Sequence, residues 1–244
     1  MEQKINNLIK NKEEIEQKYN ELIKNKEEME KKYNELKNFN DDLIKNKEEI
    51  ENKYNNFMNI QRKMDSMIIK DENIVKMLKN WINPNDSINF ELLYRGTKDG
   101  DSLNNFYLKC ENKSPTISII KTEKGKIIGG YTTIPWIKEN VSYITDENAF
   151  IFSVDSKEKY NVKKNLNGKD AVYHNRSWCC CFGYCGDDLA VGDKFLQGNN
   201  SYCCGNGDYY SFETTNDKML GTSDKGIIKF KITELEIYHI NFIN

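Results

Sequence analysis

The first third of this chain lacks the two residues that most often interrupt a helix. No glycine and no proline occurs before position 84, whereas all 14 glycines and all 3 prolines lie between Pro84 and the end. Glycine and proline mark turns and disfavour the interior of a helix. This asymmetry therefore predicts a long helical first third followed by a globular region rich in turns.

The chain also lacks an excess of charge of either sign and any long apolar run. Its 36 basic and 38 acidic side chains leave a formal net charge of −2, so no overall basic field favours nucleic acid or an anionic membrane surface. No segment approaches the roughly 18 apolar residues of a membrane span. The N-terminus is charged from Glu2 onward, unlike a signal peptide. We expect a cytoplasmic protein without nucleic-acid binding or membrane insertion.

One phrase recurs in the first third of the chain. It reads "LIKNKEEIEQKYNE" from Leu8, "LIKNKEEMEKKYNE" from Leu22 and "LIKNKEEIENKYNN" from Leu43, so the offsets of 14 and 21 residues are both multiples of seven. With Leu8 at heptad position d, an apolar residue occupies every d position: Leu8, Ile15, Leu22, Met29, Leu36, Leu43, Ile50 and Phe57. A strict repeat of seven is typical of helices that supercoil around a partner. Residues 1–68 are therefore predicted to form an α-helical coiled coil.

The heptad a positions are more polar than the d positions. They hold Ile5, Lys12, Tyr19, Lys26, Tyr33, Asn40, Lys47 and Tyr54. Lysine and asparagine at a lower the stability of a coiled coil but penalise wrong registers, and isoleucines at e widen the apolar stripe. We expect self-association of open order, and a solvated helix without a partner is the alternative. The segment 39–42 could break the helix, but the heptad stays in phase across it, which favours continuity.

Local charge pairing supports the same helix. Glutamate precedes lysine by four residues, the favourable order, at Glu14–Lys18, Glu28–Lys32 and Glu49–Lys53.

After the coil, "DENIVKMLKNWI" at residues 71–82 places apolar side chains at helical spacing, with Asp71 as N-cap and Pro84 beyond its end. We predict a helix over residues 71–82 as the first element of the globular region.

From Phe90 onward the apolar period changes to two, which is typical of strands. The segments are "FELLYR", "TISIIKT", "KIIGGY", "AFIFSV" and the closing "GIIKFKITELEIYHI", which alternates apolar and charged residues. Short strands that end at glycine or Asn/Asp clusters predict a two-sheet antiparallel sandwich. The alternation predicts one buried and one solvent-facing side for each sheet.

These segments resemble the TLDc domain family in the order of its sequence blocks. The resemblance covers roughly Asp71 to Ile240, and its most specific parts are Leu92 to Tyr94 with Asp99 and Gly100, Pro115 and Thr116, Gly129 with Trp136, Phe150 to Phe152, and Glu234 to Tyr238. The resemblance implies that residues 69–244 form a mainly β (α+β) domain, a two-sheet antiparallel β-sandwich flanked by helices, without established catalytic residues. It also implies an association with protection from oxidative stress and, in several members, with the vacuolar proton-pumping ATPase.

Four of the seven cysteines lie in "WCCCFGYCGDD", residues 178–188. Free cysteine behaves as a small hydrophobe, so packing on a strand is the simplest interpretation of Cys179, Cys180, Cys181 and Cys185. A zinc site would have to combine Cys181 and Cys185 with Cys203 and Cys204, but adjacent cysteines on a strand point to opposite faces. A redox sensor is a further alternative, and it requires exposed thiols of low pKa.

Other chemistry-bearing residues are few. A cysteine nucleophile would need His174 or His239 as its base, and both histidines sit in runs that look like strands. Asp187 and Asp188 are interpreted as turn formers, and "GNGDYY" at Gly205 lacks the lysine of a phosphate loop. We assign no catalytic, cofactor-binding or metal-ligating residue and expect no cofactor.

Three functions compete on these observations. The first is a non-enzymatic cytoplasmic adaptor in which the coil oligomerises a TLDc-like domain linked to oxidative-stress protection. The second is a regulatory protein that binds the vacuolar proton-pumping ATPase, with the coil pairing to a pump stalk. The third is a cysteine-based redox sensor or enzyme.

Overall fold

The computed structural model describes residues 1–62, 64–85, 87–139, 141–184, 188–198, 200–203, 219–222 and 226–243, and within 54–62 it describes the backbone alone. The chain divides into two compact units, Met1–Gln61 and Arg62–Asn244.

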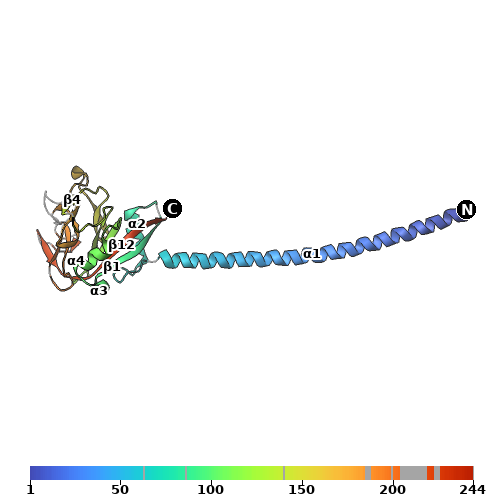
Figure 1. Cartoon of the computed structure of the whole chain (residues 1–244), viewed down its shortest axis with the longest axis horizontal. Helices are drawn as coiled ribbons and strands as arrows, with labels where there is room; N and C mark the ends of the chain where they lie inside the picture. The colour runs from blue at the N-terminus through green and yellow to red at the C-terminus, as the bar shows by residue number, and fades with distance from the viewer. Residues whose placement is uncertain are drawn as a thin grey trace. The chain divides into compact units, whose positions relative to one another are not determined.

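The first unit is one continuous helix, α1 (Glu2–Arg62), as Figure 1 shows. It runs through Asn40 without a break, which confirms the continuity predicted from the heptad phase. At 1.5 Å per residue the helix is about 90 Å long. Every described side chain from Glu2 to Lys53 is exposed, so this unit has no core of its own.

Ion pairs along α1 differ in part from those predicted. The Glu49–Lys53 pair is present at 3.8 Å, whereas the other two predicted pairs are not among the ion pairs of the described residues. Lysine precedes glutamate in three further i,i+4 pairs, Lys12–Glu16, Lys26–Glu30 and Lys47–Glu51, at 3.9, 3.8 and 3.8 Å. The repeat places these three lysines at a and their glutamates at e, so the pairs recur with the heptad.

The second unit is mainly β and, within the described residues, contains two antiparallel sheets of six strands each. Sheet 1 has the order β1-β12-β2-β3-β5-β6, and sheet 2 has the order β11-β10-β9-β8-β7-β4. Sheet 1 consists of β1 (Ser87–Arg95), β2 (Thr116–Thr122), β3 (Ile127–Thr132), β5 (Phe150–Ser153), β6 (Glu158–Asn161) and β12 (Ile232–Ile243). Sheet 2 consists of β4 (Ser142–Ile144), β7 (Val172–His174), β8 (Trp178–Phe182), β9 (Leu189–Gly192), β10 (Ser201–Cys203) and β11 (Ile228–Phe230).

The closing segment, which looked like a single alternating run, serves both sheets. Residues 228–230 pair with β10 in sheet 2, whereas β12 begins at Ile232 and pairs with β1 and β2 in sheet 1. The chain therefore passes from one sheet to the other at Lys231. The alternation does not mark this position: Phe230 and Ile232 on either side of Lys231 are in phase, and the phase changes only between Ile232 and Leu235.

Helices occupy the connections at the start of this unit. The helix α2 (Glu72–Ile82) confirms the prediction for residues 71–82, and the Asp71 side chain accepts a hydrogen bond from the Asn73 N–H at 2.8 Å. The short α3 (Gly96–Asp99), α4 (Leu103–Cys110) and the 3₁₀ turn η1 (Lys164–Leu166) follow. Ser102 caps α4, which buries Phe106, Tyr107 and Cys110.

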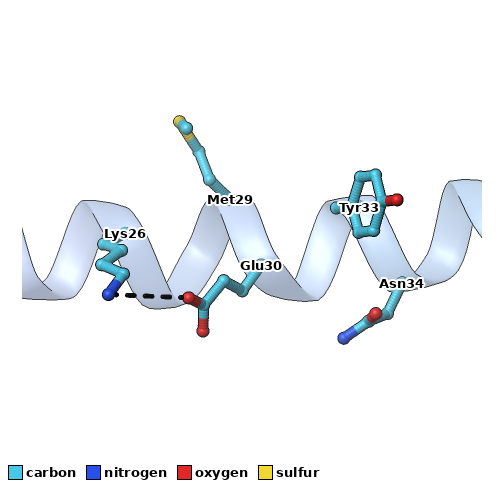
Figure 2. Close-up of a pocket in the computed structure, with 5 residues that line it drawn as sticks. All are labelled: Lys26, Met29, Glu30, Tyr33 and Asn34. Carbon is cyan, nitrogen blue, oxygen red and sulfur yellow. Dashed lines mark ion pairs between the residues drawn. The ribbon is translucent and has the colours of Figure 1, made fainter.

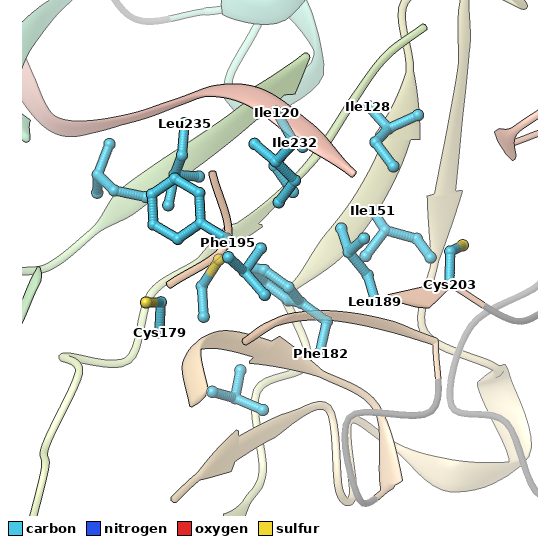
Figure 3. Packing of buried hydrophobic residues seen from close by; sticks show 14 of the residues in the cluster. Ile120, Ile128, Ile151, Cys179, Phe182, Leu189, Phe195, Cys203, Ile232 and Leu235 are labelled. Atoms are coloured by element: carbon cyan, nitrogen blue, oxygen red, sulfur yellow. The ribbon is translucent and has the colours of Figure 1, made fainter. Parts of the chain in front are cut away.

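One hydrophobic cluster, called here the shared core, takes side chains from both sheets. Figure 3 shows Ile120, Ile151 and Leu235 from sheet 1 close to Phe182, Leu189 and Cys203 from sheet 2. At Gly130 a β-carbon would lie 2.6 Å from the Phe182 ring. Glycine at this position of β3 therefore allows a strand of one sheet to approach an aromatic ring of the other.

A second cluster, called here the single-sheet core, covers the other face of sheet 1. The segment 64–69 and α2 contribute Met64, Ile68, Ile69, Val75 and Leu78, which pack on strand residues including Ile117, Phe150 and Tyr238. The prediction of a solvent-facing side is thus wrong for the central strands of sheet 1. Because alternate residues of these strands enter different cores, all four residues of β5 are buried.

Candidate interaction sites

The d seam of α1 is an extended exposed apolar surface. From Leu8 to Ile50 its seven side chains are between 50% and 70% exposed. Single exposed apolar residues are ordinary, but a continuous stripe along a helix is typical of an interaction surface. The seam is therefore the first candidate site.

A shallow depression lies on this helix beside the d residue Met29. It is lined by Lys26, Met29, Glu30, Tyr33 and Asn34, all of which belong to α1. In Figure 2, Met29 projects away from the ion-paired Lys26 and Glu30. Side chains one turn apart on a single helix form an open hole, which in coiled coils receives a knob from another helix.

A buried charge network lies in the second unit. Glu236 on β12 is fully buried, and its Oε1 lies 2.9 Å from Nε of Arg95 at the end of β1. The Ser66 hydroxyl donates to Oε2 at 2.5 Å, and the Met67 N–H donates to Oε1 at 2.8 Å. A buried carboxylate is tolerated when its oxygens are paired and hydrogen-bonded in this way.

The same network holds the segment that follows α1. The Arg95 guanidinium donates to the Asp65 carbonyl at 2.8 Å, and the Tyr238 hydroxyl lies 2.7 Å from that carbonyl. Burial acts to lower the pKa of Arg95, but the hydrogen bond and charge of Glu236 raise it on balance. Burial also raises the pKa of Tyr238, so both groups stay protonated. The network is structural and fastens residues 65–67 to sheet 1.

Glu234 is a second buried carboxylate that is hydrogen-bonded to a connecting segment. It accepts hydrogen bonds from the Thr97 N–H at 3.1 Å and from the Thr97 hydroxyl, at the start of α3. The alternation of the closing segment predicts that Glu234 and Glu236 face solvent. Both are buried, because α3 and the segment 64–69 cover them. The block Glu234 to Tyr238 thus combines core residues with the carboxylates that fasten two connections.

The cysteine block lies on β8 and is buried. Cys179, Cys180 and Cys181 are at most 1% exposed, and Figure 3 shows Cys179 and Cys203 among the side chains of the shared core. None of the five described cysteines, these four and Cys110, is part of a disulfide. Burial raises the pKa of Cys179 and Cys110 well above the ordinary value and that of Cys180 to about 12. Cys110, Cys179 and Cys180 therefore fill space in the shared core, and burial raises their pKa, the opposite of the direction that a redox sensor requires.

No metal site appears within the part of the chain that the structure describes: no group there of three or more His, Cys, Asp or Glu side chains could hold an ion. Cys185 and Cys204, two of the four ligands in the zinc alternative, lie outside the described residues. Asp187 and the segment from Gly205 lie outside them as well. Asp188 is buried beside Gly183, whose φ of +88° and close approach to the Asp188 carboxylate both require glycine.

Neither histidine is placed to activate a described cysteine. His174 is buried on β7 with its ring 6.3 Å from that of Trp136, and burial lowers its pKa. His239 Nε2 lies 2.9 Å from the Ser114 carbonyl, and its Nδ1 lies 3.5 Å from a Glu91 carboxylate oxygen. Among the described residues, no hydrogen bond joins either imidazole to a cysteine sulfur.

Two surface features of the second unit involve aromatic side chains. Tyr143 on β4 stacks on Tyr173 and on Tyr184, with ring centroids 4.7 and 4.8 Å apart, at the edge of sheet 2.

A hollow of about 360 Å³ lies over β3, β5 and β6 of sheet 1. One of the residues that line it, Lys159, donates a hydrogen bond to the Trp81 carbonyl at 3.1 Å. The ammonium of Lys159 also lies over the Phe150 ring, and burial lowers its pKa. This lysine therefore holds the end of α2 against sheet 1.

The family model of the TLDc domain matches residues 63–241. The chain belongs to the TLDc domain family. The TLDc match begins directly after α1, so the second unit is the TLDc domain of this protein. In the described residues, no helix has the length and apolar character that crossing a membrane requires.

Curated relatives match over a shorter stretch. TBC1 domain family member 24 is 31% identical over 75 residues in Xenopus tropicalis and 29% identical over 75 residues in Xenopus laevis, in each case 28% of this chain and 13% of the relative. The GTPase-activating protein skywalker of Drosophila melanogaster is 32% identical over 71 residues, 26% of this chain and 12% of the relative. The match thus spans about an eighth of these proteins.

Proposed function

We propose that this protein is a non-enzymatic cytoplasmic adaptor, in which a coiled coil formed by α1 joins several copies of the TLDc domain. The exposed d seam of α1 carries this proposal. Seven apolar side chains at a strict spacing of seven stay in water unless another helix covers them. The TLDc domain, proposed to be a two-sheet sandwich around the shared core, supplies the contact to a protein partner.

Joining several domains changes how such a partner is bound. Once one domain has bound, a second domain on the same assembly meets its site at a high effective concentration. Overall binding is then stronger without any new contact in the domain itself. The proposal includes no GTPase activation, because the match to skywalker covers only 12% of that protein.

Sedimentation of the full chain tests the self-association. Leu22→Gln with Leu36→Gln places polar groups at two d positions, and we expect this variant to sediment as a monomer where the parent is oligomeric. Lys24→Gln with Lys31→Gln is the matched control at two outward f positions. Glutamine has a helix propensity close to that of leucine and lysine, so helix content stays comparable. A monomeric parent would refute the proposal.

The pump-binding alternative differs in what the seam contacts. In that case α1 pairs with a helix of the vacuolar proton-pumping ATPase instead of with a second copy. Purified pump immobilised on beads distinguishes the two possibilities. An adaptor carrying the Leu22→Gln, Leu36→Gln change should keep weak binding through single TLDc domains, whereas a stalk-binding helix should lose the pump altogether.

A further inference from the structure

The heptad a positions of α1 carry three lysines whose placement bears on the direction of pairing. From the surroundings of these lysines we infer that two copies of α1 pair in opposite directions over their full length. The inference rests on the proposed self-association and adds its geometry. It concerns the side chains between Lys12 and Ile50, all of which the structure describes.

Parallel pairing in register would bring like charges together. In that arrangement each a residue faces the same a residue of the second copy, so Lys12, Lys26 and Lys47 would each face its own copy. Three ammonium pairs would then lie along a seam that excludes water, where repulsion is stronger than in bulk solvent. The g residues that precede them, Asn11, Asn25 and Asn46, offer no carboxylate across the interface.

Antiparallel pairing removes these like-charge layers. Each a residue then faces a d residue of the second copy, and every d residue of this helix is apolar. Full overlap of the two helices gives six distinct layers within the described side chains, each occurring twice: Lys12 on Ile50, Ile15 on Lys47, Tyr19 on Leu43, Leu22 on Asn40, Lys26 on Leu36 and Met29 on Tyr33. Each layer contains an aliphatic side chain, so the apolar surface is continuous along the seam.

The ion pairs within α1 suit this packing. Each of the three a lysines already pairs with a glutamate at e of its own helix, at 3.8 to 3.9 Å. In Figure 2 the Lys26 ammonium turns toward Glu30 and away from Met29. A lysine held in this way can lay its methylene stem across the facing Leu36 while its charge stays in water. Two facing lysines would have no such apolar partner.

Other features favour pairing of α1 with a second copy of the chain but say less about the direction of pairing. Residues 1–70 hold 15 basic and 15 acidic side chains, so two copies do not repel each other overall. Opposed helix dipoles also favour antiparallel pairing. Asn40 favours the parallel arrangement, where it would face its own copy and form a hydrogen bond. Lys32, at heptad position g, would face a lysine of the second copy in a parallel and in an antiparallel pair, so it does not distinguish them. Three lysine layers outweigh one asparagine layer.

The direction of pairing sets the spacing of the TLDc domains. In an antiparallel pair, the two ends of α1 from which these domains continue are separated by about 90 Å, the length of the helix. The assembly could then connect two binding sites that are far apart. A parallel pair would instead hold both domains over neighbouring sites.

Disulfide trapping in the full chain tests the direction. Tyr19→Cys and Leu43→Cys occupy facing positions only in the antiparallel pair, and are combined in one chain under mild oxidation. Tryptic mapping should yield a peptide with residue 19 linked to residue 43, in at least about tenfold excess over links between identical positions. Each single variant should stay unlinked. The parent chain, oxidised alike, accounts for links through native cysteines.

The outcomes separate the inference from the proposed function. Links of 19 to 19 and 43 to 43 overturn the antiparallel direction but keep the adaptor. An oligomer without either kind of link overturns the full-overlap register. A parent that sediments as a monomer overturns the proposed self-association itself. Because cysteine at a single a or d position can weaken pairing, sedimentation of both single variants at the trapping concentration is measured alongside.

Discussion

The helix α1 and the TLDc domain are stabilised by contacts of opposite range. In α1 every backbone hydrogen bond and every ion pair joins residues about one turn apart, and all described side chains are exposed. In the domain, the bond from Ser66 to Glu236 spans 170 residues. Local contacts build an element whose apolar seam stays exposed within the chain. Long-range contacts build a unit that buries its apolar surface within one chain.

Breaking the buried network should have the largest effect on this comparison. Glu236→Ala removes the buried carboxylate that pairs with Arg95 and leaves its guanidinium only the mostly exposed Asp65 carboxylate, at 3.3 Å, and we expect a loss of about 3 to 5 kcal/mol in the free energy of unfolding of the domain. Urea denaturation followed by tryptophan fluorescence measures it, because all three tryptophans lie after residue 80. Self-association through α1 should be unchanged.

Glu91→Ala is the matched control for this change. Glu91 is also a glutamate of sheet 1, but its side chain is 58% exposed and is hydrogen-bonded by Asn241 at 3.1 Å. A partly exposed contact of this kind contributes less than about 1 kcal/mol. Equal losses for Glu91→Ala and Glu236→Ala would show that the buried network has no special role. Loss of the oligomer in Glu236→Ala would show that the two units do not stabilise independently.

The next largest loss of stability is expected where two strands of sheet 1 approach each other closely, at Gly129. At Gly129 a β-carbon would lie 2.1 Å from the Ser118 carbonyl oxygen and 2.4 Å from the Phe152 ring. Gly129→Ala therefore forces the strands to shift, at a cost of about 1 to 3 kcal/mol or more. Gly198→Ala is the control, since its nearest atom would be 3.4 Å away on the Asn200 side chain. Thermal unfolding of the domain measures both, and equal melting temperatures would contradict the steric argument.

The sequence predicted those parts of the fold that depend on local pattern. The heptad gave a continuous helix, Asp71 and the apolar spacing after it gave α2, and the period of two gave β2, β3 and β5. These signals are local because each element's own residues set its period and its caps. The TLDc resemblance over roughly Asp71 to Ile240 is confirmed by the family match at residues 63–241.

Features set by long-range packing were not predictable from the pattern. The burial of Glu234 and Glu236 depends on α3 and the segment 64–69, which reach β12 from more than 100 residues away. The change of sheet at Lys231 depends on where β10 and β2 lie. The proposed pairing partner of α1 is a second chain, so the heptad predicts an apolar seam but not what covers it.

Titration of a buried histidine gives a smaller, pH-dependent effect. Burial holds the pKa of His174 below its ordinary value of 6.5, so the unfolded chain binds this proton more tightly than the folded domain does. The stability that neutral His174 contributes is fully present above pH 6.5 and is lost as the pH falls below that value. Between about pH 7.5 and pH 5.5 the loss should reach at most about 1.4 kcal/mol. His174→Gln should abolish this part of the pH dependence, and an unchanged slope would contradict it.

Removing one ion pair from α1 should have the smallest effect of all. The Lys26 and Glu30 side chains are both mostly exposed and 3.8 Å apart, and exposed pairs of this kind contribute little because water and salt screen them. Glu30→Gln should therefore leave helix content, measured by circular dichroism, and sedimentation of the full chain within error of the parent. Leu22→Gln with Leu36→Gln introduces the same glutamine side chain into the d seam and should dissociate the oligomer. If Glu30→Gln dissociated it instead, charge pairing along the helix, and not the apolar seam, would be what joins the copies.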